Sequence, residues 1–486
     1  MRRSVARLCV VAEQESPLTK SIWKASVRSV RVESVWDTFS KQVVAQAPFL
    51  TPREVATIVH SFARVKYRDD RTLTAITPSI LKHLDAFSVR EIVHIMSAFR
   101  KLEYAKLDCI DLLINQLVLK FSEWNEVDCA LIANAVGWFR IFDESLWKHI
   151  GKFSMKHEFE PLGLSLILGA MAKLDRRHEP VLRRFARQLL EVPPSSGAVF
   201  KQESFAILVH AFYKLGWTKN YRLNMFFEDQ ARLLLGHEKF FDFQSLTLVL
   251  HAMFGYRVRE IGSELTESQS ELLDRGLEAV IEATADHKMS LDQYRRLRTL
   301  VKISTNWCDL SDTTRDRIAE VKRILKKQTF PDKRGHKLPR WEYEVYRILK
   351  DKMQVPVVKR VRDGRTDIFV KPHGGGEEVC VLCLGPFQYY AGSTKRTTSS
   401  ILNQHLVGKR SLEIPYFVWN ELKTDQDKVA FLYTLGRRLA RADPAAESEV
   451  ESEEIEFTHD QDDESMQKII LTETDKSQLI AALDNS

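Results

Sequence analysis

A repeating helical pattern constrains the fold of this chain more than any other feature of its sequence. Six segments between residues 50 and 256 place large apolar residues at helical spacings around a small residue, as in Ile58, Val59 and Phe62. The small residues are 37, 37, 35, 41 and 41 positions apart, at Ser61, Ala98, Ala135, Ala170, Ala211 and Ala252. A helix pair of this length cannot bury its apolar face alone, so the period predicts a stacked array of helix pairs.

Each unit also begins with residues that favour helix initiation. Thr51 and Ser88 are expected to cap the first helices of two units, and Pro52 suits the first helical position. Glu54 and Glu91 lie three residues after these caps, which is the spacing of a capping box. We therefore expect a helical-repeat solenoid over residues 41–256 with an extended concave surface.

The period and its apolar pattern resemble the octotricopeptide and heptatricopeptide repeats of organellar RNA-binding proteins. This resemblance implies single-stranded RNA as the ligand, with successive repeats contacting successive bases. A protein-binding solenoid of the HEAT type has a similar period and stays open as an alternative.

The segment 257–340 is expected to hold capping helices and a basic linker. Residues 257–330 continue as helices that are off the repeat pattern, and we expect them to cap the array. A basic linker follows between residues 322 and 340, in which Asp332 is the single acid. Its candidate RNA-binding residues are Lys326, Lys327, Lys333 and Arg334. The pattern fits phosphate binding and a solvated hinge equally well.

From Trp341 the pattern changes to a small α/β domain, expected over residues 341–442. Helices are predicted in residues 341–353, 398–412 and 425–442, and strands in residues 355–361, 366–370, 379–385 and 412–417. The predicted fold class is therefore mainly α, a solenoid of paired helices followed by one α/β domain.

This domain carries an ordered set of motifs: Asp367 in a strand, Gly385 and Pro386 after an apolar strand, the helix segment ILNQHL, and Trp419 after EIPYFV. In that order they resemble the RAP domain, which is similar to restriction endonucleases. The resemblance implies a fold in which clustered carboxylates would hold a divalent metal.

The sequence departs from the RAP pattern where the metal ligands would be. Leu382 and Leu384 stand where acidic residues are typical, and a hard divalent cation needs several oxygen ligands. We therefore expect no enzyme activity, no metal and a vestigial Asp367. The alternative is a metal-dependent RNA endonuclease with a rearranged site at Asp367, Glu377 and Glu378.

Other residues of the domain have the chemistry to contact RNA. The cationic candidates for phosphate contacts are Lys395, Arg396, Lys409 and Arg410. Tyr389 and Tyr390 could stack on bases, although core packing fits the two tyrosines equally well.

Charge also favours a nucleic-acid partner. Residues 443–486 hold 14 acidic residues against Lys468 and Lys476, a net charge of −12, so the total of +6 leaves +18 on residues 1–442. A body this basic attracts phosphate backbones, although an excess of solvated lysines would give the same count. The acidic tail has the composition of a disordered segment.

Several other classes find no support in the sequence. No apolar run is long enough to span a membrane, and no phosphate loop, dinucleotide fingerprint or nucleophile elbow occurs, so no cofactor and no small-molecule substrate are expected. Cys380 and Cys383 lie three apart on a strand and point to opposite faces, which favours buried thiols over a zinc site.

The first twelve residues contain Arg2, Arg3 and Arg7 and no acid before Glu13. This composition is typical of a mitochondrial transit peptide over residues 1–40, and a basic N-terminus in another organelle or the cytoplasm is the alternative. The combined hypothesis is a matrix protein that binds mitochondrial mRNA or rRNA and acts in rRNA maturation, RNA stability or ribosome assembly. A structural subunit among mitochondrial ribosomal proteins is the rival interpretation.

Overall fold

The structure, a computed structural model, describes residues 16–441 except 192–199, 236–241, 259–264, 287, 306–309, 329–337, 339, 363–364, 372–377 and 408–409. The described residues up to Val429 form one compact unit, and those from Ala430 to Arg441 belong to a second. The first twelve residues, whose composition led to the transit-peptide prediction, and the acidic tail, residues 443–486, lie outside the described residues. The domain boundaries expected from the sequence stay predictions.

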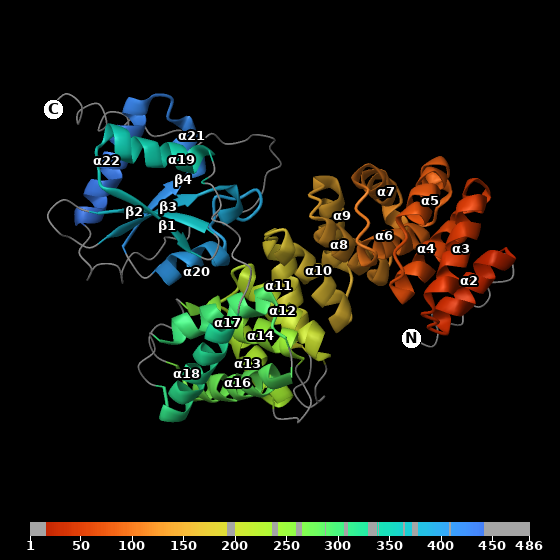
Figure 1. Cartoon of the computed structure of the whole chain (residues 1–486), viewed down its shortest axis with the longest axis horizontal. Helices are drawn as coiled ribbons and strands as arrows, with labels where there is room; N and C mark the ends of the chain where they lie inside the picture. The colour runs from red at the N-terminus through yellow and green to blue at the C-terminus, as the bar shows by residue number, and fades with distance from the viewer. Residues whose placement is uncertain are drawn as a thin grey trace. The chain divides into compact units, whose positions relative to one another are not determined.

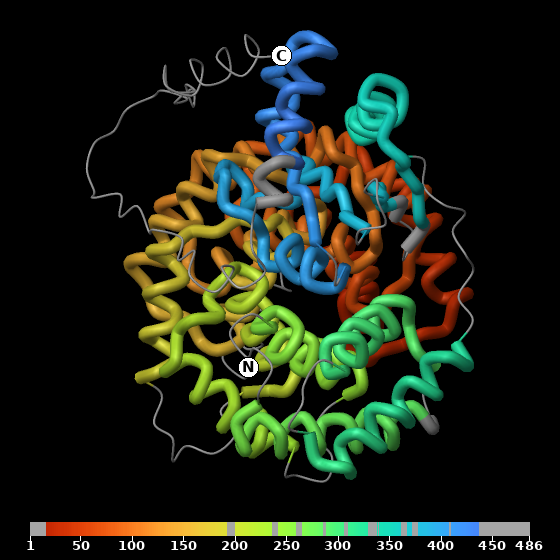
Figure 2. The backbone as a smooth tube through the Cα atoms, turned by 90° about the vertical axis from the view of Figure 1, so that its left-hand side faces the viewer, coloured from red at the N-terminus to blue at the C-terminus, as the bar shows by residue number. Residues whose placement is uncertain are grey.

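Paired helices follow one another in chain order through the first half of the chain (Figure 2). One helix of each pair lies in the inner row: α2 (Pro17–Val27), α4 (Pro52–Val65), α6 (Val89–Lys101), α8 (Glu126–Phe139), α10 (Pro161–Lys173), α12 (Gln202–Lys214) and α14 (Phe243–Leu250). The other lies in the outer row: α3 (Glu33–Gln46), α5 (Asp70–Lys82), α7 (Leu107–Leu119), α9 (Glu144–Lys156), α11 (Glu179–Leu190) and α13 (Tyr221–Leu235). Figure 1 shows the two rows side by side, which confirms the helical-repeat array.

The array extends beyond the aligned segments at both ends. At its start, α2 and α3 form one more pair that packs on α4 and α5. At its end, α14 continues as the short π-helix η5 (His251–Gly255). The helices α16 (Glu267–Asp286) and α17 (Leu291–Ser304) then pack on α14, and α18 (Asp312–Lys327) packs on both α16 and α17.

Capping boxes start the inner helices of the first two repeats, as predicted. The Thr51 hydroxyl accepts from the backbone N–H of Glu54 at 3.4 Å, and the Glu54 carboxylate accepts from that of Thr51 at 3.0 Å. Ser88 and Glu91 make the same pair of bonds. Glu54 accepts a further bond, from the backbone N–H of Ser16 at 3.0 Å, so this carboxylate also holds the start of α2. Burial opposes its ionisation, but the hydrogen bonds from Thr51 and Ser16 lower the pKa of Glu54.

Small residues let the inner helices approach one another closely. Each small residue of the repeat is at most 1% exposed, namely Ser61, Ala98, Ala135, Ala170, Ala211 and Ala252. A Cβ atom added to Gly137 in α8 would lie 2.6 Å from the Cβ of Ala170 in α10, whereas carbon atoms ordinarily pack at about 3.5–4.0 Å. Inner helices pack more closely than outer helices do. In a curved array this places the inner row on the concave side.

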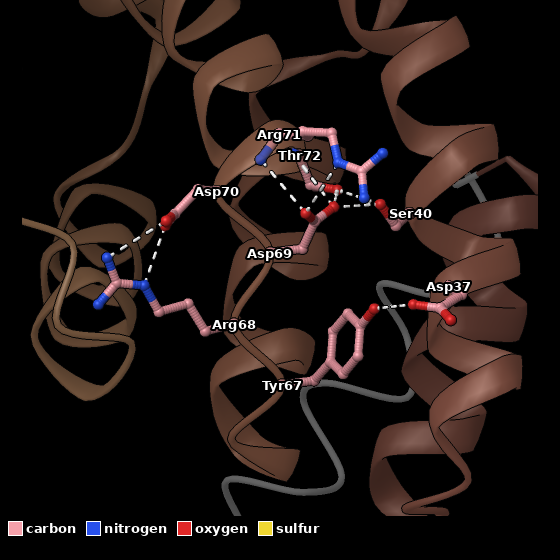
Figure 3. A network of polar contacts seen from close by, with 8 residues as sticks. All are labelled: Asp37, Ser40, Tyr67, Arg68, Asp69, Asp70, Arg71 and Thr72. Carbon is pink, nitrogen blue, oxygen red and sulfur yellow. Dashed lines mark hydrogen bonds and ion pairs between the residues drawn. The ribbon is translucent and has the colours of Figure 1, made fainter.

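The connection between α4 and α5 is tied to the preceding helix pair by a polar network (Figure 3). The Tyr67 hydroxyl donates to the carboxylate of Asp37 in α3, which together with burial raises the pKa of Tyr67. The Asp69 carboxylate caps α5, accepting from the Thr72 hydroxyl at 2.7 Å and from the Ser40 hydroxyl of α3. Burial opposes its ionisation, but these hydrogen bonds lower the pKa of Asp69. The network fixes the orientation of the first repeat relative to α3.

The C-terminal region is an α/β fold around one sheet. Its helical elements are α19 (Arg340–Arg347), η6 (Ile348–Lys352), η7 (Pro386–Gln388), α20 (Thr398–Val407), α21 (Tyr416–Glu421) and α22 (Asp425–Arg441). Its strands are β1 (Val357–Arg362), β2 (Arg365–Val370), β3 (Val379–Leu384) and β4 (Ser411–Pro415). They lie in the order β1-β2-β3-β4, antiparallel except for the parallel pair β3 and β4, which α20 connects. Figure 1 shows α20 on the opposite face of the sheet from α19 and α21.

One strand is shorter than the sequence predicts. The strand expected to run to Phe417 ends at Pro415, and α21 begins at Tyr416. The short helix carries Trp419, which is 1% exposed and donates its indole N–H to Glu344 of α19 at 3.1 Å. Glu344 also accepts from Lys428 of α22 at 2.8 Å. A continued strand would remove this buried indole from its acceptor, so tertiary packing overrides the local strand preference.

Candidate nucleic-acid interface

One face of the inner row is open to solvent, and cations recur on it at the end of the helices. Residues three positions after the small residue lie at equivalent places in the six repeats, at Arg64, Lys101, Trp138, Lys173, Lys214 and Gly255. Arg64, Lys101 and Lys173 are exposed. This regular placement follows from the repeat itself, because each helix is superimposed on the next by the same register.

Four cations on this face form what we call the inner basic cluster: Arg64 in α4, Arg100 and Lys101 in α6, and Lys173 in α10. Within the described part of the chain, none of the four makes an ion pair. Burial, and then the charges of Arg100 and Arg64, lower the pKa of Lys101. Burial and the charge of Arg100 lower the pKa of Lys173. Lys101 is therefore repelled by Arg100 and Arg64, and Lys173 by Arg100, and a bound anion would relieve that repulsion.

Arg100 is the most constrained member of the cluster. Its Nε atom is buried and has no hydrogen-bond partner among the described residues, and burial lowers the pKa of the guanidinium. An unsatisfied buried donor on a cation is costly, whereas a charge-assisted bond to a phosphate oxygen is strong. The Arg100 side chain is thus available to donate a hydrogen bond to an anionic ligand.

Two histidines lie beside the cluster on the same face. The rings of His60 in α4 and His94 in α6 have centroids 4.8 Å apart. Burial, followed by neighbouring positive charges, lowers the pKa of His60 to about 3 and that of His94 to about 4. Both imidazoles are therefore neutral at pH 7, and the local positive charge comes from the arginines and lysines.

Lys214 lies at the equivalent repeat position but differs from the members of the inner basic cluster in its contacts. Its ammonium forms an ion pair with Asp175 at 3.0 Å and donates to the backbone oxygen of Ala172 at 2.5 Å. The backbone oxygen of Lys214 accepts from the Tyr390 hydroxyl at 2.8 Å. Lys214 is therefore committed to internal contacts, unlike the members of the inner basic cluster.

The cationic residues predicted from the sequence lie at separate places. Lys326 and Lys327 are exposed in the last turn of α18. Lys395 is exposed in the turn before α20, and Arg410 is exposed before β4. Lys333, Arg334 and Lys409 lie outside the described residues.

Arg396 and the two tyrosines are used inside the α/β fold. The Arg396 guanidinium donates to Glu413 at 2.5 Å and to Gln404 at 2.8 Å. Tyr389 is 7% exposed and Tyr390 is 2% exposed, so both rings are packed in the interior of the fold. Core packing was one of the two interpretations that the sequence left open for these tyrosines. An RNA contact by any of these three residues stays a prediction.

The sheet also places the residues at which the RAP resemblance would put a metal site. Asp367 lies in β2 opposite Arg360 of β1. Leu384 is 3% exposed in β3, and Leu382 is half-buried there. Glu378 pairs with Arg360 at 2.6 Å, and Glu377 lies outside the described residues. No group of three or more potential metal ligands occurs among the residues that the structure describes.

Comparison with known families first defines the class of the protein. Residues 381–435 match the RAP domain, a segment that runs from β3 into α22. The chain therefore combines a helical-repeat array with a RAP domain, which confirms the prediction from the sequence. In the part of the chain that is described, no helix is both long and apolar enough to cross a membrane.

A second comparison concerns the array. Residues 10–195 match the family of the RNA-editing substrate-binding complex 6 protein. The matched segment contains all four members of the inner basic cluster. No curated protein matches the chain. Together the two family matches point to RNA binding in RNA processing.

Sequence reasoning missed the inner basic cluster although a signal for it exists. Arg64, Lys101 and Lys173 are 37 and 72 positions apart, so no local charge run reveals them. All three lie three residues after an aligned small residue, at Ser61, Ala98 and Ala170. Comparing charge by repeat position, and not by sequence window, would have found them.

Proposed function

We propose that this protein binds RNA through the concave face of its helical array and acts in mitochondrial RNA processing. The observation that carries the proposal is the inner basic cluster, four cations without an ion pair in the described residues, on the open face of a segment that matches an RNA-editing family. Phosphates are the ligands that this arrangement suits best, because several unpaired cations release several counterions when they bind a phosphate backbone.

The RAP domain contributes contacts in this proposal and no cleavage. Leucines at positions 382 and 384 replace the acidic residues that the RAP pattern places there, which supports a binding role over metal-dependent hydrolysis. Exposed Lys395 and Arg410 supply positive charge on this domain.

The mitochondrial part of the proposal is supported by the arginine-rich, acid-free start of the chain. The RNA would be a mitochondrial mRNA or rRNA, and the step would be rRNA maturation, RNA stability or ribosome assembly. Mitochondrial ribosomal proteins are candidate partners in the last of these.

Crosslinking in cells tests the proposal directly. The tagged full chain is crosslinked, recovered RNA is sequenced, and a matched sample carries alanine at Arg64, Arg100, Lys101 and Lys173. We expect a few organellar transcripts to be enriched with the wild type and lost with the variant. Recovery of equal RNA by both proteins would contradict the role of the inner row, and recovery of no RNA would contradict RNA binding.

Two further readouts separate the rival functions. Incubation of the recovered RNA with purified protein and Mg²⁺ is expected to leave it intact, whereas cuts that disappear in an Asp367→Ala variant would establish an endonuclease. Stable sedimentation with ribosomal subunits at high salt would favour a structural ribosomal role over a transient factor.

A further inference from the structure

Among the residues that the structure describes, Trp138 on the inner row is not packed against the hydrophobic core. The ring is half-buried near the end of α8. Half-buried Leu131, Leu166 and Phe139 nearby all pack against the hydrophobic core, whereas Trp138 does not. Its ring contact among the described residues is a T-shaped one with Phe139, with centroids 5.0 Å apart and planes at 89°. The indole N–H of Trp138 also has no hydrogen-bond partner among the described residues.

The position of Trp138 places it between the cations of the inner basic cluster. It occupies the same repeat position as Lys101 in the preceding inner helix and Lys173 in the following one. Neighbouring packed helices are about 8–10 Å apart, so each of these lysines is one helix away. The close approach of Gly137 to Ala170 holds α8 and α10 together at this level. An aromatic face thus lies in line between positive charges.

We propose that Trp138 stacks on an unpaired RNA nucleobase while Arg100 and Lys101 on one side, and Lys173 on the other, bind the adjoining phosphates. Proteins that bind single strands combine a cationic track with aromatic stacking platforms, because every base offers a flat π face. A base inside a duplex is already stacked and paired and cannot use this platform. The site therefore selects single-stranded over double-stranded RNA, and the inference rests on the RNA-binding function proposed above.

Three labelled ligands of equal length test the inference with the purified full chain. They are a single-stranded uridine oligonucleotide, an abasic oligonucleotide with the same phosphates, and a blunt RNA duplex. Affinities are measured by fluorescence anisotropy at fixed salt. Trp138→Ala is expected to weaken binding of the uridine strand by roughly 5- to 140-fold, the range expected for loss of one stacked base. It is expected to leave binding of the abasic strand and the duplex unchanged.

Two further variants control for folding and for generic aromatic contacts. Trp138→Phe keeps an aromatic face and is expected to retain most of the affinity. Tyr221→Ala removes an exposed aromatic ring from the outer helix α13, 73% exposed, and is expected to have no effect. Thermal melting followed by circular dichroism checks that each variant is folded.

The possible outcomes separate this inference from the function on which it rests. If the wild type binds none of the three ligands, the proposed function fails. If the wild type binds the uridine strand and Trp138→Ala binds it equally well, stacking is wrong while RNA binding stands. Equal weakening on the abasic strand would also overturn stacking, and would make Trp138 a structural residue or a contact for a protein partner.

Discussion

Neutralising the inner basic cluster has an effect that can be worked out from the structure. The change is alanine at Arg64, Arg100, Lys101 and Lys173, which carry no ion pair among the described residues, so no acidic partner is left unpaired. Each cation that binds a phosphate of a single strand contributes about 0.7 to the slope of log K against log salt. Four contacts therefore contribute a slope of about 2.8.

The expected size of the effect follows from that slope. When salt is raised from 50 to 200 mM, these four contacts alone should lower the affinity of the wild type for RNA by a factor of about 50. The quadruple variant should lack this part of the salt dependence, and its slope should fall by about 2.8. The assay is anisotropy titration of a labelled single-stranded RNA at five salt concentrations.

A matched control makes the result specific to the inner row. Alanine at Lys82, Lys152, Lys156 and Arg187 removes the same charge from exposed positions on outer helices α5, α9 and α11. The slope of this control variant should stay close to that of the wild type. Equal reductions in the two quadruple variants would refute the reasoning, because they would show that net charge and not location determines binding.

Three more outcomes concern stability. Glu54→Ala removes three hydrogen bonds, so the backbone amides of α2 and α4 should exchange at least tenfold faster in hydrogen-exchange mass spectrometry. Glu91→Ala should have a smaller effect, because the bonds between Glu91 and Ser88 stay within one capping box. Gly137→Val should destabilise the array by about 1–3 kcal/mol in urea unfolding, because its side chain meets Ala170; unchanged stability would contradict the close approach. The pKa of His94 is lowered to about 4, so unfolding takes up protons and stability should fall as pH drops from about 6.5. His94→Gln should make that decline shallower, and an unchanged pH profile would argue against a buried neutral imidazole.

Local signals account for what the sequence predicted well. The caps at Thr51 and Ser88, the period of the inner helices and the strands of the RAP domain all follow from spacings of a few residues. Such features depend on backbone geometry within one element, which the order of residues largely specifies. The prediction for β4 was wrong at its end because the partner of Trp419, Glu344, is 75 residues away.

The candidate site was harder to predict because it is assembled from several repeats. Arg396 looks like a phosphate contact in the sequence, yet Glu413 and Gln404 already accept from it across the α/β fold. Conversely, Arg64 and Lys173 look like ordinary surface residues until the stacking of helices brings them to one face. Charge in a linear sequence shows how much cation is present and says little about which cations are unpaired.

The small residues between inner helices have a consequence for evolution as well as for packing. Because the spacing of the inner row depends on side-chain volume at a few buried positions such as Gly137 and Ala170, a single larger residue there would move neighbouring inner helices apart without changing a cation. Substrate preference could then shift through the distance between Lys101 and Lys173 instead of through their identity. Related arrays could thus differ in the RNA they bind while keeping the same charged residues. Their specificity would then depend on the small residues that set the spacing of the inner helices.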